Sequence, residues 1–173
     1  MNIILIGFKS CGKSTIGQAL AEYLTMSFID TDTLLEERHA KSKGEHLSFR
    51  EIYKQYGKLY FRTLEKQITD HLGQIDKYVI AAGGGTFINY PITPQIQQNS
   101  KLFYLEASPT VLIPRIKTGG LPAFFRTDDF EQEFNRLFNQ REPIYESIAD
   151  YTIEISNLDI QNVVHRVIKY LEM

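Results

Sequence analysis

The sequence predicts an α/β fold: a three-layer sandwich in which helices cover both faces of a five-stranded parallel sheet. Short apolar runs alternate along the chain with segments of helical apolar spacing, and this alternation favours a parallel sheet. The length of 173 residues fits one domain, spanning 1–173.

The apolar runs and the helical spacing give the elements in order. The expected strands are 2–6, 27–29, 78–82, 101–107 and 151–155. The expected helices are 13–24, 32–41, 48–56, 58–73, 109–118, 129–140 and 159–172. Two segments depart from the alternation of strands and helices, and we expect them to move and to contact ligands. In 41–75 helices follow one another without a strand, and 119–129 is rich in turn-forming residues.

Composition excludes several classes of protein. Lys and Arg total 19 against 21 Asp and Glu, so nucleic acid is not expected as the main partner. The one cysteine, Cys11, cannot form an internal disulfide, which favours a reducing compartment. No apolar run approaches the roughly 18 residues of a membrane span, and the first ten residues lack the basic start and the cleavage site of a signal peptide. We expect a cytoplasmic protein with no membrane partner.

Residues 7–15 read GFKSCGKST, between the strand 2–6 and the helix from Lys13. They match G-x-x-x-x-G-K-[ST] in the strand–loop–helix setting that the motif requires. Glycines let backbone N–H groups approach phosphates, the lysine reaches the outer phosphates, and the hydroxyl of Ser14 can ligate Mg²⁺. The pattern predicts a nucleoside triphosphate site formed by Ser10, Cys11, Gly12, Lys13, Ser14 and Thr15.

Cys11 has two interpretations. It stands near Lys13 at a helix start, where positive charge favours the reactive thiolate. Cysteine is also among the most buried residue types, so its side chain could point into the core and be inert.

Asp30 and Asp32 mark the end of the second expected strand, where open α/β sheets bind ligands. Residues i and i+2 of an extended segment share a face, so the two carboxylates can divide their roles between a metal ion and an acceptor hydroxyl. Alternatively, Asp32 caps the helix that follows.

Three further patterns are weak individually. Arg62 and Glu65 lie one helical turn apart, which is usually a surface ion pair. Three glycines at 83–85 follow a strand, where a ligand can approach the backbone closely. Arg141 and Tyr145 are four residues apart on a possible helical turn.

Taken together and in this order, the motifs resemble the shikimate kinase family over nearly the whole chain. The matching stretches are GFKSCGKST, DTD, FRTLE, GGG and REPIY. The resemblance implies a P-loop kinase of the nucleoside-monophosphate-kinase-like fold, with a substrate-binding insert at about 32–75 and a lid at about 115–129. The implied reaction transfers the γ-phosphate of ATP to the 3-hydroxyl of shikimate, on the pathway to chorismate.

The resemblance also implies roles for individual residues. Asp32 would hold the accepting hydroxyl, and Arg62 and Arg141 would bind the carboxylate of shikimate, for which arginine forks are well suited. The remaining implied contacts are Gly83, Gly84 and Gly85 with the ring hydroxyls, and Ser14 and Asp30 with Mg²⁺. Arg115 and Lys117 lie in the helix before the lid, where the family tends to have residues near the adenine, and Lys117 is the one expected to bind the nucleotide. We expect ATP, Mg²⁺ and shikimate as ligands of a monomer.

The chain departs from the family pattern in the lid. The family usually has Arg-Pro-Leu-Leu there, whereas Leu121 precedes Pro122 in this chain. Arg126 is our candidate to replace the absent arginine on lid closure; alternatively, it is a solvated charge beside Asp128 and Asp129. The stretch SNLDI also lacks the proline that often lines the adenine in relatives.

These departures keep two other functions open. A gluconate kinase would share the P-loop but would not need Arg62 and Arg141 to converge on a carboxylate. A regulator could bind nucleotide or shikimate without catalysis, having kept the pocket and lost the lid chemistry.

Overall fold

The computed structural model describes residues 1–119 and 129–173. Its strands form one sheet in the order β2-β3-β1-β4-β5, and every neighbouring pair is parallel. The strands are β1 (Asn2–Ile6), β2 (Ser27–Asp30), β3 (Tyr78–Ala81), β4 (Ser100–Glu106) and β5 (Tyr151–Glu154). The predicted α/β class and the five parallel strands are confirmed.

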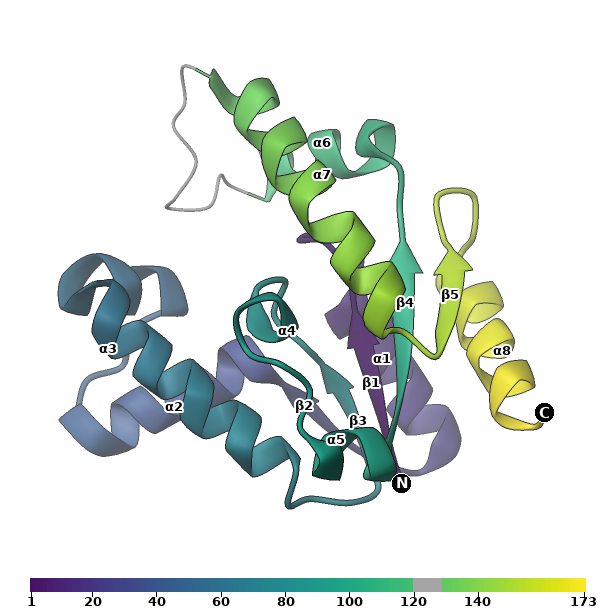
Figure 1. Cartoon of the computed structure of the whole chain (residues 1–173), viewed down its shortest axis with the longest axis horizontal. Helices are drawn as coiled ribbons and strands as arrows, with labels where there is room; N and C mark the ends of the chain where they lie inside the picture. Colours follow the sequence, from purple (N-terminus) through teal and green to yellow (C-terminus); the bar gives the residue numbers. More distant parts are fainter. Residues whose placement is uncertain (120–128) are drawn as a thin grey trace.

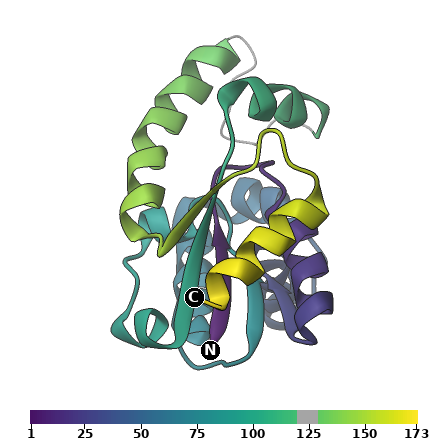
Figure 2. The same cartoon turned by 90° about the vertical axis from the view of Figure 1, so that its right-hand side faces the viewer.

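The sheet lies between two layers of helices. All five residues of β1 are buried, as expected of a central strand covered on both faces. Helices α1 (Lys13–Leu24) and α8 (Ile160–Leu171) pack together on one face, while α7 (Phe130–Ile148) contacts β4 from the other (Figure 2). Helix α6 (Pro109–Thr118) follows β4 and lies near the start of α7 (Figure 1).

Helices α2 (Thr31–Lys43) and α3 (Phe49–Leu72) pack on each other beyond the β2 edge of the sheet (Figure 1). Gly57, with φ 78° and ψ 172°, interrupts the helical geometry of α3. The two halves correspond to the helices predicted at 48–56 and 58–73. Helix α3 lies within the segment 41–75, where the sequence predicted successive helices and no strand, and the end of α2 reaches into it.

Helix α7 continues to Ile148, past its predicted end at residue 140. Pro143 lies inside it and lacks the N–H that would bond the preceding turn, which is why the pattern favours a stop. Packing overrides this signal, because Phe134, Phe138 and Tyr145 are buried along one side of the helix.

Two short helices, α4 (Thr86–Asn89) and α5 (Pro94–Asn99), were not predicted. They are too short to show a helical period. Thr93 and Pro94 are nevertheless ordinary start signals for α5, and the Thr93 hydroxyl accepts from the backbone N–H of Ile96.

The chain segments that carry the predicted motifs leave the same edge of the sheet. The P-loop follows β1, Asp30 ends β2, and the glycines at 83–85 follow β3. The carboxyl ends of these neighbouring parallel strands therefore bring the motifs together. Across residues 1–119 and 129–173, the helices include none with the length and apolar content needed to cross a membrane.

Candidate active site

The P-loop turns on glycines with positive φ. Gly7 has φ 143° and Gly12 has φ 98°. A Cβ on Gly7 would lie 2.7 Å from the Leu105 carbonyl oxygen, so no larger residue fits there without a shift. Gly12 is the N-cap of α1, and within the described residues no side chain caps that helix. Its first N–H groups are therefore available to an anion.

Lys13 is held inside the curve of this loop. Its side chain is buried, and its ammonium donates to the carbonyl oxygens of Gly7 at 3.0 Å and Phe8 at 2.9 Å. The Cys11 sulfur lies 3.6 Å from the same ammonium and is part of a residue only 1% exposed. The burial of the thiol favours the inert interpretation of Cys11. The two carbonyl oxygens hold the Lys13 ammonium in the loop.

Ser14 and Asp30 form a pair of oxygen ligands suited to Mg²⁺. The Ser14 hydroxyl donates to Asp30 Oδ2 at 2.5 Å. Groups of three or more His, Cys, Asp and Glu residues able to hold a metal do not occur in 1–119 or 129–173. Mg²⁺ is usually bound by one or two protein oxygens together with substrate phosphates and water, and the Ser14 and Asp30 oxygens offer such a pair.

Asp30, rather than Asp32, caps helix α2. Asp30 Oδ1 accepts from the backbone N–H of Asp32 at 2.9 Å, which identifies Asp30 as the N-cap. The alternative in which Asp32 serves as the cap is therefore wrong. The carboxylate of Asp32 instead packs against Gly83, where a Cβ would lie 2.6 Å from Asp32 Oδ1.

The surroundings of Asp32 raise its pKa. Burial and the neighbouring Asp30 carboxylate raise the pKa of Asp32 to about 6, against the opposing effect of the Lys13 and Lys9 ammoniums. A carboxyl group that gains or loses its proton near neutral pH is suited to general-base catalysis.

Arg62 and Arg141 both act electrostatically on one carboxylate, that of Glu65. Arg62 on α3 forms an ion pair with Glu65, whose side chain is 13% exposed. Burial raises the pKa of Glu65, whereas Arg62 and Arg141 both lower it, so both guanidiniums lie within its electrostatic range. Arg141 on α7 also donates to the Gly84 carbonyl oxygen at 3.4 Å. The two arginines predicted to bind a substrate carboxylate are thus brought together from distant parts of the chain.

The glycine segment is anchored between α7 and the P-loop. The hydroxyl of Tyr145 donates to the Gly84 carbonyl oxygen, which explains why Tyr145 and Arg141 are one turn apart. A Cβ on Gly84 would lie 3.5 Å from the Gly7 carbonyl oxygen, so the glycines at 83–85 lie beside the P-loop.

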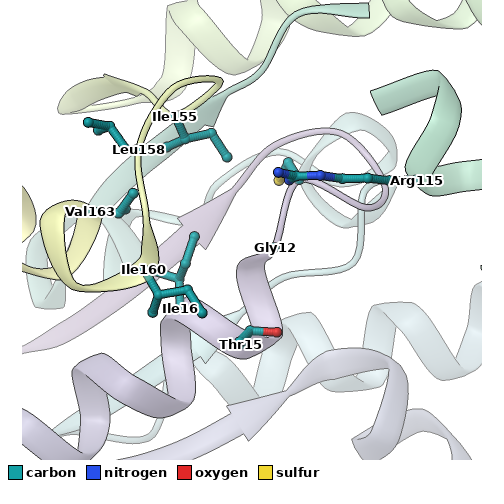
Figure 3. Close-up of a pocket in the computed structure, with 9 residues that line it drawn as sticks. Gly12, Thr15, Ile16, Arg115, Ile155, Leu158, Ile160 and Val163 are labelled. Atoms are coloured by element: carbon teal, nitrogen blue, oxygen red, sulfur yellow. The ribbon is translucent and has the colours of Figure 1, made fainter. Parts of the chain in front are cut away.

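A cavity of about 220 Å³ lies on the other side of the P-loop, between α1, α6 and α8 (Figure 3). Figure 3 shows the Arg115 side chain extending from α6 toward the P-loop near Gly12. The lining residues are Cys11, Gly12, Thr15, Ile16, Arg115, Ile155, Leu158, Ile160 and Val163. An apolar cavity with one guanidinium, adjoining a phosphate loop, has the chemistry of a site for a nucleotide base.

Arg115, not Lys117, lines this cavity in the part of the chain that the structure describes. Lys117 is exposed, with its ammonium 3.4 Å from Glu131 and 5.4 Å from the centroid of the Phe130 ring. Both cations flank the buried Ile116 and are exposed, so burial along α6 does not distinguish them; the lining of the cavity does. No motif marks either residue in the sequence.

The lid residues Leu121, Pro122 and Arg126 lie outside the described residues. The replacement of the missing lid arginine by Arg126 therefore stays a prediction.

Comparisons with known proteins agree with this arrangement. A family model described as Shikimate kinase matches residues 9–172. A shikimate kinase from Caldanaerobacter subterraneus subsp. tengcongensis is 37% identical over 169 residues, covering 97% of this chain and 94% of that protein.

Solved structures distinguish this family from others that share its fold. The shikimate kinase from Acinetobacter baumannii in complex with shikimate has a TM-score of 0.87 at 26% identity, over 98% of this chain and 92% of that chain. A gluconokinase from Sinorhizobium meliloti has a TM-score of 0.59 at 16% identity, over 99% of this chain and 95% of that chain, which shows a shared fold alone. Since the family model and a relative above 30% identity both span nearly the whole sequence, the chain belongs to the shikimate kinase family.

Proposed function

We propose that this protein transfers the γ-phosphate of ATP to the 3-hydroxyl of shikimate, with Mg²⁺. The observation that carries this proposal is that Arg62 and Arg141 both lie within electrostatic range of one carboxylate, Glu65, which is itself within range of Asp32. A substrate with one carboxylate and several hydroxyls suits such a site, because paired arginines bind a carboxylate and Asp32 accepts from a hydroxyl.

On the nucleotide side, the P-loop N–H groups and Lys13 would bind the phosphates, and the base would enter the cavity beside Arg115. Ser14 and Asp30 would hold Mg²⁺, which neutralises charge on the phosphate oxygens when it is bound.

On the acceptor side, Arg62 and Arg141 would orient the shikimate ring through its carboxylate. The glycine backbone at 83–85 lies close enough to Asp32 to contact the ring hydroxyls. Asp32 would align the attacking hydroxyl and take its proton, so catalysis consists mainly of positioning and charge stabilisation.

Two finer points belong to the same proposal. We infer a monomeric enzyme, because the P-loop, Asp32 and both arginines come from a single chain. We also infer a cytoplasmic one, because its nucleotide substrate is made and used there.

The assignment is tested by a coupled assay of ADP release. With MgATP, shikimate should stimulate ADP release strongly, while gluconate and nucleoside monophosphates should leave it at the background rate. Mass spectrometry of the product should show one added phosphoryl group. Stimulation by gluconate instead, or no acceptor-dependent release at all, would contradict the proposal and favour one of the two alternatives.

Arg141→Ala and Arg62→Ala should each weaken the use of shikimate far more than that of ATP. Losing a bidentate, charge-assisted contact costs roughly 2–3 kcal/mol, which corresponds to a KM for shikimate about 30- to 150-fold higher. Steady-state kinetics with each substrate varied in turn would measure this difference.

Arg136→Ala is the matched control for these variants. Arg136 lies on α7 five residues before Arg141, is exposed, and pairs with Glu133. Its replacement should leave both KM values unchanged. Arg62→Ala also removes the ion pair with Glu65 and could lower stability. The thermal unfolding of each variant should therefore be measured beside its kinetics, to separate a loss of stability from a loss of substrate binding. Equal losses for ATP and shikimate would assign the arginines a structural role.

A further inference from the structure

Lys9 is a P-loop residue that lies on the acceptor side of the loop. It is half-buried, and its ammonium lies 5.4 Å from the centroid of the Phe49 ring at the start of α3. Its backbone nitrogen lies 3.6 Å from the position of a Cβ on Gly84. Lys9 is thus enclosed by the P-loop, the glycine segment and the substrate-binding helices.

The position of Phe49 beside Lys9 is fixed by a contact between helices. The backbone N–H of Phe49 donates to Glu36 Oε1 at 2.8 Å, which ties the start of α3 to α2. The Arg50 guanidinium carbon lies 5.7 Å from the centroid of the same Phe49 ring. The Phe49 ring therefore packs against two cations, Lys9 and Arg50, at the start of α3.

The Lys9 ammonium interacts electrostatically with Asp32 and Lys13, the two residues proposed to act on the acceptor and on the phosphates. Burial and the Arg50 guanidinium lower the pKa of the Lys9 ammonium, Asp32 raises it, and Lys13 lowers it. Lys9 thus lies within electrostatic range of the carboxylate that would hold the accepting hydroxyl and of the cation that would hold the donor phosphates. A surface lysine with its ammonium in water would not sense both.

We propose that Lys9 is a second catalytic cation, which donates from the acceptor side to an oxygen of the phosphoryl group in transfer. This rests on the proposed function, in which Lys13 binds the same group from the nucleotide side. A cation on each side would neutralise charge along the path from ADP to the acceptor.

The step balances without a chemical change in Lys9. The bond between the γ-phosphorus and the β–γ bridging oxygen breaks, and its electron pair leaves with ADP. A bond forms between the acceptor hydroxyl oxygen and that phosphorus, while the hydroxyl proton passes to Asp32. Lys9 keeps its three protons and stabilises the negative charge as it is redistributed over the phosphoryl oxygens.

Two substitutions separate this role from packing against Phe49. Lys9→Met keeps an unbranched stem and removes the charge, whereas Lys9→Arg keeps the charge. Lys9→Met should lower kcat at least tenfold and change the KM for ATP and shikimate less than threefold. Lys9→Arg should restore kcat to within about threefold of the parent. The matched control is Lys169→Met, at an exposed position in the last turn of α8, which should leave kcat unchanged.

A binding measurement provides an independent test. Titration calorimetry with ADP, Mg²⁺, aluminium fluoride and shikimate, which together mimic the transferring phosphoryl group, should show at least tenfold weaker binding to Lys9→Met. Binding of MgADP alone should be unchanged. If Lys9→Met does not fold, Lys9→Gln answers the same question.

Three outcomes would overturn the proposal: parental kcat in folded Lys9→Met, a loss confined to KM, or Lys9→Arg as slow as Lys9→Met. If the unmodified enzyme phosphorylates shikimate, any of these outcomes would reject the role of Lys9 and leave the proposed function in place. A parent inactive on shikimate would reject the proposed function first.

Discussion

Replacing Lys13 by Met should abolish turnover while leaving the fold intact. The ammonium is held by the Gly7 and Phe8 carbonyls inside the loop, and the proposed function uses it to neutralise the charge that develops between the β- and γ-phosphates. Met keeps the length of the side chain but removes that charge. We expect kcat to fall by about 10³ or more, the order found when a preorganised cation is removed from phosphoryl transfer.

The measurement is single-turnover and steady-state kinetics at saturating MgATP and shikimate, with thermal unfolding as the test of folding. Two carbonyl oxygens lose a donor, so a decrease in stability of about 1–3 kcal/mol is expected. Lys169→Met, at an exposed site of α8, should have neither effect. Parental turnover by a folded Lys13→Met variant would refute the assignment of the P-loop to phosphoryl transfer.

Asp32→Asn should lower kcat by about 10²–10⁴, the usual contribution of a positioned general base. The amide matches the carboxylate in shape but cannot take the hydroxyl proton. We expect KM for shikimate to change much less, because the arginines would still bind the carboxylate of the substrate. A variant with parental turnover would show that Asp32 does not act in the chemical step.

The same variant should be more stable than the parent at neutral pH. The pKa of Asp32 is about 6 in the folded protein against 3.8 as its ordinary value. A raised folded pKa means that protonation favours the folded state, and this contribution is lost as the pH rises from about 4 through 6. Above pH 6 the buried carboxylate lowers the free energy of unfolding by an amount on the order of 1–3 kcal/mol.

Chemical denaturation of the parent and of Asp32→Asn, without ligands, would measure this difference. Asp32→Asn should gain about 1–3 kcal/mol at pH 7.5, and the gain should shrink progressively between pH 6 and pH 4. Asp159→Asn is a suitable control, because Asp159 is an exposed helix cap remote from the site in sequence. A gain of constant size across this pH range would show that ionisation of Asp32 is not its cause.

The sequence by itself determined the elements whose cause is local. Strand β1, the P-loop and α1 are contiguous, and the glycines, lysine and hydroxyl that form the phosphate site are within eight residues of one another. Helix α6 also has the predicted bounds, 109–118, because Pro109 at its first turn is a local start signal. The order of strands and helices follows in the same way, from the alternation of buried apolar runs.

Tertiary structure decided the properties that depend on residues far apart in the sequence. Arg62 on α3 pairs with Glu65, and Arg141 on α7 lies within electrostatic range of the same carboxylate, although 79 residues separate the two arginines and nothing local to either indicates this. The burial that raises the pKa of Asp32 comes from neighbouring elements, and packing of its aromatic face carries α7 past Pro143. Burial and electrostatic fields are sums over all neighbours in space, so a local pattern cannot specify them.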